Sequence, residues 1–315
     1  MFRTRLLSGI VLVAIAFGTI WAGGWVLALV LCLISVVAYL ELTRATGVRG
    51  KAQQADEKQS TMKDVVARTE KGAAKDSSAY SAGMNGLEWT GIVLILLYYA
   101  GLFIGMRQME AYDRTIVYVI LTAFTVLSLL IFMFIYVFRF PDYKAGQVMA
   151  AFFELIYAPV LLSFLYIIRE GWSHGIYLSA LIFLCSWGSD TCAYCVGVLF
   201  GKHKMTPKLS PKKSVEGAVG GVVGAALLFG LYTYYVINPF STQQYQLHWG
   251  AAMCLGAAGA LVSMIGDLVA SAIKRDYGIK DYGKLIPGHG GIMDRFDSVI
   301  VAAPLIFLGL SLIAS

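Results

Sequence analysis

Three aspartates stand where the last two apolar segments of the sequence meet. Asp267 lies inside one apolar run, and Asp294 and Asp297 stand at the start of the next. Residues three apart share one face of a helix, and carboxylates at a helix N-terminus interact well with its dipole. The pair could therefore simply cap the last helix. If the connecting segment folds back, the three carboxylates converge and supply hard oxygen ligands for one or two divalent metal ions such as Mg²⁺.

The segment that joins these two runs mixes cations, carboxylates and glycines. Lys274 and Arg275 begin it, and His289 stands between Gly288 and Gly290. Lys and Arg side chains neutralise phosphate oxygens, and glycines let backbone amides approach an anion closely. This mixture is typical of a site for a nucleoside triphosphate with its divalent metal ion.

A second basic segment precedes another apolar run. It contains Lys202 and Lys204, followed by Lys212 and Lys213 within Ser-Pro-Lys-Lys-Ser. Basic residues beside a membrane span serve as anchors or attract anionic lipids, and we interpret Lys202 and Lys204 in this way. For Lys212, Lys213 and Glu216 we favour binding of a nucleotide or lipid phosphate, on the motif given below.

Acidic residues inside apolar runs are costly in a membrane and by default mark function. We expect a functional role for Asp190 as well as for Asp267. For Glu154 the choice between a polar clamp in the helix bundle and a functional role stays open. Cys192 and Cys195 have the C-x-x-C spacing, but without a second pair or an adjacent His we interpret them as small apolar residues of a helix.

The elements that position these residues are membrane helices. Hydrophobic residues make up 58% of the 315 positions and charged residues only 14%, whereas soluble domains are roughly a quarter charged. The expected fold class is all-α, a polytopic membrane protein with about nine spans of about 20 residues each. The expected spans are Leu6–Ala22, Trp25–Leu42, Gly91–Met106, Thr115–Phe138, Gln147–Ile168, Ile176–Phe200, Val215–Ile237, Trp249–Ile273 and Ser298–Ala314.

The Lys and Arg residues predict the orientation of these spans. With the N-terminus in the cytoplasm, 22 of the 25 Lys and Arg residues fall on the cytoplasmic side, as the positive-inside rule requires. The C-terminus then lies outside. The basic residues occupy short loops, which argues against a nucleic-acid partner. The start of the sequence could imitate a signal peptide, but a second apolar run follows at once, so we prefer a spanning hairpin.

This reading divides the chain into four regions. Residues 1–43 form the N-terminal hairpin and residues 44–90 a polar cytoplasmic loop with one short helix near Met62–Thr69. Residues 91–170 hold the middle helices, and residues 171–315 form the catalytic region.

The segment from Ser271 to Asp297 resembles the diagnostic motif of phosphatidate cytidylyltransferases, also called CDP-diacylglycerol synthases. Every fixed position of that motif is met, by Ser271, Lys274, Arg275, Lys280, Asp281, Pro287, Gly288, His289, Gly290, Gly291, Asp294, Arg295 and Asp297. Two further family elements are similar to Asp190, Thr191, Ala193, Tyr194 and Gly197, and to Ser210, Pro211, Lys212, Lys213, Ser214, Glu216 and Gly217. The resemblance is strong from about residue 186 to 298 and weak before it.

The resemblance implies a multi-pass, dimeric enzyme of the inner membrane with a metal-dependent site on the cytoplasmic side. It would convert CTP and phosphatidate into CDP-diacylglycerol and pyrophosphate, with membrane lipids around it. Asp267, Asp294 and Asp297 would hold Mg²⁺ or two metal ions, and the expected catalytic residues are these three with Asp190 and Lys274. The expected substrate-binding residues are Lys212, Lys213, Glu216, Ser271, Arg275, His289, Gly290, Gly291 and Arg295. His289 either donates to a phosphate or only shapes the loop.

Other functions compete with this one. A CTP-dependent polyprenol or phytol kinase, or a cytidylyltransferase for an ether lipid, shares the nucleotide chemistry but uses another acceptor. The complete match from Ser271 to Asp297 argues against the kinase. An ion-coupled transporter would use Asp190, Glu154 and Asp267 as relays, but it has no need of the cytoplasmic loop and would release no pyrophosphate. A pure scaffold leaves both basic segments unexplained.

Overall fold

The computed structural model describes residues 2–49, 83–108, 115–240, 246–286 and 290–313. The first helix of this part of the chain is α1 (Phe2–Ala22), with an apolar stretch at Ser8–Ala22. Eight longer helical segments within the described residues have the length and composition to cross a membrane. They are α2 (Gly24–Ala45), α5 (Gly86–Gln108), α6 (Thr115–Phe138), α7 with α8 (Ala145–Gly171), α9 with α10 (Gly175–Phe200), α11 with α12 (Val215–Phe240), α13 (Trp249–Asp276) and α14 (Met293–Ile313).

These helices confirm the expected all-α, multi-pass membrane fold. The span predicted as Thr115–Phe138 has those bounds, whereas α5 begins at Gly86, before the expected start at Gly91. Glu88 explains the earlier start, because its backbone amide donates to Asn85 Oδ1 (2.9 Å) and its carboxylate accepts from Asn85 N (3.0 Å). This reciprocal pair caps the helix. The short helix expected near Met62–Thr69, with most of the 44–90 loop, lies outside the described residues.

Three of the described spans contain a π-helical turn, at Ile156–Val160, Leu184–Gly188 and Thr233–Ile237. Pro159 lies in the first, where it lacks the amide that an α-helix needs. The second joins α9 (Gly175–Phe183) to α10 (Ser189–Phe200) and ends just before Asp190. Such turns occur frequently at functional sites because they shift the register of the side chains that follow.

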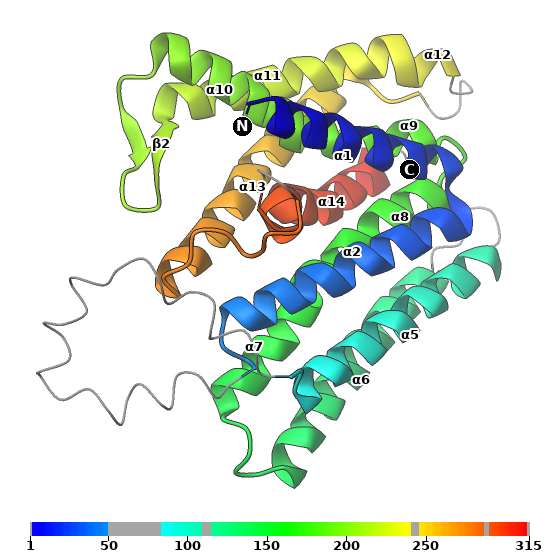
Figure 1. Cartoon of the computed structure of the whole chain (residues 1–315). Helices are drawn as coiled ribbons and strands as arrows, with labels where there is room; N and C mark the ends of the chain where they lie inside the picture. The colour runs from blue at the N-terminus through cyan, green and yellow to red at the C-terminus, as the bar shows by residue number, and fades with distance from the viewer. Residues whose placement is uncertain (1, 50–82, 109–114, 241–245, 287–289, 314–315) are drawn as a thin grey trace, which may run out of the picture.

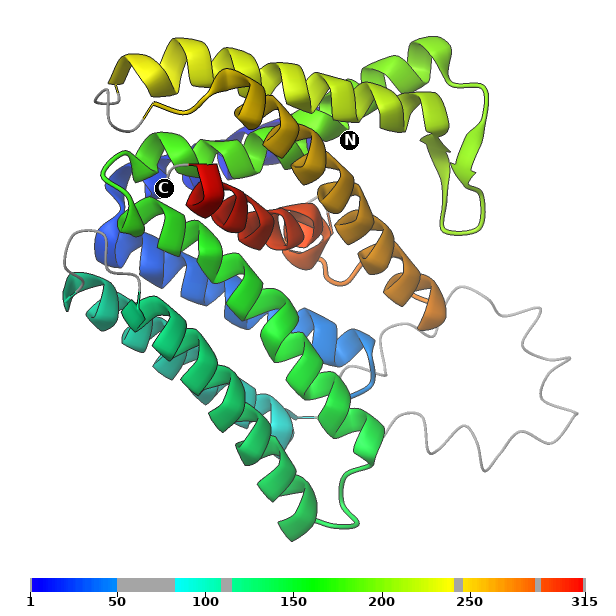
Figure 2. The same cartoon turned by 180° about the vertical axis from the view of Figure 1, so that it is seen from behind.

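The C-terminal helices form one packed group. In it α13 contacts both α11 and α14, α10 packs along α11, and α14 also packs on α8. Figures 1 and 2 show α10 and α11 at one edge of the molecule, α5 and α6 at the opposite edge, and α14 between them. The N-terminus, the β-hairpin and the end of α13 lie toward one end, and the α1–α2 turn and the C-terminus toward the other.

Glycines set the closest approaches in this group. A Cβ at Gly266 of α13 would lie 2.8 Å from the carbonyl oxygen of Asp297 on α14, and one at Gly217 of α11 would lie 2.8 Å from the carbonyl oxygen of Ala193 on α10. Small residues let membrane helices touch along their backbones. Because Gly266 precedes Asp267, the contact at Gly266 places Asp267 beside the start of α14.

One small antiparallel sheet accompanies the helices in the described part of the chain. Strands β1 (Lys204–Thr206) and β2 (Ser210–Ser214) form a hairpin where the sequence analysis expected only a basic loop. Ser214 ends β2 and caps α11 (Val215–Tyr232), since its Oγ accepts from Gly217 N (3.1 Å). The strand therefore runs directly into the helix and fixes Lys212 and Lys213 beside the helix start.

The contact at Gly266 predicts a specific loss of stability. Gly266→Ala should lower the unfolding free energy by about 1–3 kcal/mol, because the added methyl overpacks the α13–α14 contact. The matched control is Gly101→Ala in α5, where a Cβ would meet no heavy atom within 4 Å. Thermal denaturation in detergent measures both. Equal midpoints for the two variants would contradict the close approach of α13 and α14.

Candidate active site

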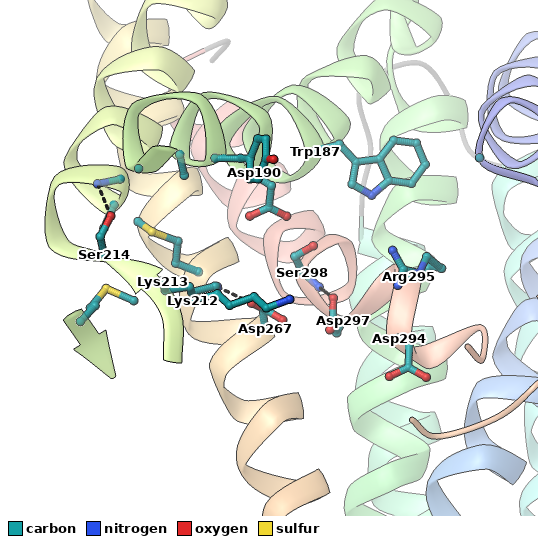
Figure 3. A pocket seen from close by; sticks show the side chains of 18 of the residues that line it. Trp187, Asp190, Lys212, Lys213, Ser214, Asp267, Asp294, Arg295, Asp297 and Ser298 are labelled. Atoms are coloured by element: carbon teal, nitrogen blue, oxygen red, sulfur yellow. Dashed lines mark hydrogen bonds and ion pairs between the residues drawn. The ribbon is translucent and has the colours of Figure 1, made fainter. Parts of the chain in front are cut away.

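A charged cavity of about 780 Å³ lies among α1, α10, β2, α11, α13 and α14. Of the residues expected from the sequence, it is lined by Asp190, Lys212, Lys213, Asp267, Lys274, Asp294, Arg295 and Asp297. Trp187, Tyr194, Asp281 and Ser298 also line it and were not predicted as site residues. Figure 3 shows acidic and basic side chains from four separate elements facing this space. The fold therefore brings the two basic segments and the aspartates together.

Lys213 and Asp267 form an ion pair in the cavity, between the end of β2 and the C-terminal half of α13. Both side chains are partly exposed to the cavity. The start of β2 is fixed by its pairing with β1, and its end by the Ser214 cap on α11. The hairpin therefore positions Lys213 beside the carboxylate of Asp267 on a transmembrane helix.

Asp297 is a buried carboxylate of the cavity lining. It is 6% exposed, and its Oδ1 accepts from Ser298 N (2.7 Å). Within the described residues, no lysine or arginine forms an ion pair with Asp297 or with Asp190. A buried carboxylate without a cationic partner is costly. The carboxylates of Asp190 and Asp297 therefore offer oxygens to the cavity that no described ion pair occupies.

Asp294 has its oxygens engaged by the protein itself. Its side chain is 4% exposed, and Oδ1 accepts from Lys274 Nζ (2.8 Å). Its Oδ2 accepts from the backbone amides of Tyr282 (2.9 Å) and Gly291 (3.0 Å). In Figure 3 it is turned away from Asp190 and Asp267. Asp294 therefore organises the segment between α13 and α14 and joins it to Lys274 at the end of α13.

Tyr282 provides a second contact between α13 and the segment that joins α13 to α14. Its hydroxyl donates to the carbonyl oxygen of Ala270 on α13 (2.9 Å). Burial raises the pKa of the Tyr282 phenol, so the hydroxyl keeps its proton and remains a donor. Lys274 Nζ lies 5.3 Å from the centre of the same ring, which adds a cation–π contact.

Glu41 reaches this segment from the distant helix α2. Its Oε1 accepts from Ile292 N (3.1 Å) and its Oε2 from Met293 N (2.8 Å), and the residue is 4% exposed. The sequence analysis assigned no role to Glu41, which stands one residue before the end of the span expected at Trp25–Leu42. An acidic residue at that position is equally typical of the end of a membrane span. The sequence therefore indicated a role for Glu41 in the site only weakly.

Some expected site residues are placed elsewhere. Glu216 binds the start of the hairpin, where it accepts from Lys202 N (3.1 Å) and contacts His203 Nδ1 (2.6 Å). Ser271, Arg275, Glu216, Gly290 and Gly291 are not among the described residues that line the cavity. His289 lies outside the described residues.

Glu154, whose role the sequence left open, is buried beside the end of α2. Its Oε1 accepts from Thr46 Oγ1 (2.5 Å), and it does not line the charged cavity. This contact ties α7 (Ala145–Leu155) to the end of α2 and fits the reading of Glu154 as a polar clamp. Cys192 and Cys195 are free thiols on α10.

The donor atoms of the cavity fit a divalent cation that brings its own oxygen ligands. In the described part of the chain, no three acidic, histidine or cysteine side chains lie close enough to form a metal site by themselves. Asp294 is committed to Lys274 and two amides, which leaves Asp267 and Asp297 as the aspartates nearest the α13–α14 contact. Mg²⁺ usually takes one or two carboxylates together with phosphate oxygens and waters. Two carboxylates plus a triphosphate satisfy that preference.

The chain is similar to several known bacterial proteins. A phosphatidate cytidylyltransferase of Haemophilus influenzae is 36% identical over 131 residues, which cover 42% of this chain and 44% of the relative. One of Mycobacterium tuberculosis is 35% identical over 175 residues (55% and 50%), and one of Staphylococcus epidermidis 35% over 160 residues (50% and 57%). The chain spans about half the length of the curated relatives it matches. Residues 73–313 match the model of the cytidylyltransferase family. The chain therefore belongs to the cytidylyltransferase family.

Proposed function

We propose that this protein is a phosphatidate cytidylyltransferase, which converts CTP and phosphatidate into CDP-diacylglycerol and pyrophosphate. One observation carries the proposal beyond the family: the charged cavity adjoins an apolar cavity inside a membrane protein. The apolar cavity has a volume of about 660 Å³ and lies mainly between α1 and α2. Ser8, Leu12 and Ile286 line both cavities. A substrate with a phosphate head and acyl chains matches this pair of compartments.

The charged cavity supplies the groups that a triphosphate needs. Lys212, Lys213, Lys274 and Arg295 line it, and cationic side chains form strong charge-assisted hydrogen bonds with phosphate oxygens. Its volume falls within the range of small-molecule sites. Lys213 and Lys274 are already held by Asp267 and Asp294, so both ammonium groups are positioned before the ligand arrives.

The proposed reaction is a direct displacement at phosphorus. An oxygen of the phosphatidate phosphate attacks the α-phosphorus of CTP, a new P–O–P bond forms, and the bond to the β-phosphate oxygen breaks. Pyrophosphate leaves with that electron pair. The attacking monoester is already anionic near neutral pH, so no strong general base is needed. Catalysis then depends on positioning and on neutralisation of charge.

The protein residues divide this task. Lys212, Lys213, Lys274 and Arg295 orient the two phosphate-bearing substrates and offset their repulsion. Asp267 and Asp297 would hold Mg²⁺, which supplies further neutralisation of the triphosphate when it is bound. Asp190 faces the same space and adds a further carboxylate beside the lysines of the lining. Asp294 holds the segment that carries Arg295.

The surroundings of the site belong to the same proposal. We place the protein in the inner membrane with the charged cavity on the cytoplasmic side, because 22 of the 25 Lys and Arg residues then lie in the cytoplasm. CTP is available there. A homodimer among membrane lipids remains our expectation for the assembly.

A reaction panel tests the activity directly. Purified protein is incubated with labelled CTP, Mg²⁺ and one acceptor at a time: phosphatidate, an ether-linked analogue, a polyprenol or phytol. We expect a lipid-soluble cytidine product and one pyrophosphate per turnover with phosphatidate. A phosphorylated alcohol with release of CDP would instead identify a lipid kinase, and no CTP-dependent product with any acceptor would refute the enzyme.

The two aspartates beside the α13–α14 contact should be essential. Asp267→Asn and Asp297→Asn should each lower kcat by roughly 100-fold or more, because each removes one negatively charged cation ligand. The control is Asp142→Asn, an exposed aspartate that pairs only with Arg139 among the described residues. Activity of the unmodified protein should vanish with a chelator and return with Mg²⁺. Full activity in both variants would remove Asp267 and Asp297 from the metal site.

The apolar cavity should set the apparent affinity for the lipid. Ile15→Trp places bulk on an exposed α1 residue that lines this cavity, and it should raise the KM for phosphatidate several-fold while leaving the KM for CTP unchanged. Ile10→Trp is the matched control, since Ile10 is an exposed α1 residue outside both cavity linings. Identical lipid kinetics in the two variants would argue against this acyl-chain site.

A further inference from the structure

Glu41 connects the N-terminal helices to the segment that carries the site aspartates. It lies on α2, yet both of its carboxylate oxygens accept from backbone amides about 250 positions later in the chain, at Ile292 and Met293. Both donors stand at the start of α14. Amides at a helix start lack partners within the helix, and a negative charge there also interacts favourably with the helix dipole.

The backbone around Glu41 is shaped to receive its carboxylate. A Cβ at Gly291 would overlap both oxygens of Glu41, and a Cβ at Gly283 would overlap Oε1. Glycine at these two positions lets the segment close on the buried carboxylate. The amide of Gly291, next to the donors of Glu41, in turn donates to Asp294 Oδ2 (3.0 Å). Glu41 and Asp294 thus hold consecutive amides of one short stretch.

We propose that Glu41 is a positioning residue for the reaction. Its carboxylate fixes where α14 begins, and thereby the direction in which Asp294 and Asp297 project. This inference rests on the proposed function. Glu41 precedes residues 73–313, the part of the chain that matches the family model. The N-terminal hairpin therefore contributes a determinant of the active-site geometry as well as a wall of the apolar cavity.

The test compares two buried glutamates that bind helix starts. Glu41→Gln keeps the size of the side chain but replaces one acceptor oxygen by an NH₂ group, which cannot accept from a backbone amide. Glu88→Gln is the matched control, because Glu88 is also buried, accepts from a backbone amide at the start of α5, and lies outside the cavity lining. Both variants should lose some thermal stability.

Kinetics separate positioning from stability. Per folded molecule, Glu41→Gln should lower kcat at least about tenfold and raise the Mg²⁺ concentration for half-maximal rate. Its KM for phosphatidate should rise by a smaller factor than kcat falls, because most residues that line the apolar cavity belong to α1 and α2. Glu88→Gln should keep all three values. Equal stability losses with wild-type kcat in both variants would overturn the proposal.

A mutant cycle locates the effect in this segment. Gly283→Ala should lower kcat in the wild-type background because its methyl displaces Glu41. It should have a much smaller further effect in a Glu41→Ala background, because the overlap with the carboxylate is gone and only the 3.2 Å approach to Gly291 Cα remains. Independent, multiplying losses would contradict action through Glu41.

Hydrogen exchange separates failure of this inference from failure of the proposed function. The amides of Ile292 and Met293 should exchange faster in Glu41→Gln than in the unmodified protein, and those of α5 should not. This measurement needs no activity, so it remains decisive if the reaction panel finds no product. Unchanged exchange at both amides would overturn the contact itself.

Discussion

The structure depends on the compensation of carboxylates that are gathered at the ends of membrane helices. Charges removed from water are costly unless partners are built around them. Lys213 compensates Asp267, and Lys274 with two backbone amides compensates Asp294. Asp297 accepts a hydrogen bond from the amide of Ser298. Carboxylate oxygens and ammonium groups therefore stand side by side in the charged cavity, and this combination suits a cation that binds together with a polyphosphate.

The helix packing follows from the same requirement. Carboxylates on two helices can share one cation only if the backbones come close, and Gly266 allows that approach between α13 and α14. The Ser214 cap brings the end of β2 to the same place. Glu41 and Tyr282 then fix the connecting segment from two directions. Each of these contacts is local, but together they restrict the orientations of the aspartate side chains.

Much of this site could be predicted because its chemistry is concentrated in two short stretches. The membrane spans follow from hydrophobic runs. The ion pair of Lys213 with Asp267 joins a residue suggested by a motif to one suggested by its position inside an apolar run. Side-chain direction could not be predicted. Asp294 turns to backbone amides and Glu216 to His203 because the folded backbone offers donors that no spacing rule reveals. Glu41 was missed because its partners are about 250 positions away.

The residues that line both cavities have a consequence for how lipid substrate and product would exchange in the proposed reaction. Phosphatidate and CDP-diacylglycerol carry the same two tails, and only the head group grows during the proposed reaction. Leu12 and Ile286 line both cavities. In the proposed reaction, the tails would therefore stay in the apolar cavity while the nucleotide arrived from water and pyrophosphate returned to it. Substrate and product would then exchange by two-dimensional diffusion in the bilayer, and the lipid never needs to be extracted from its leaflet.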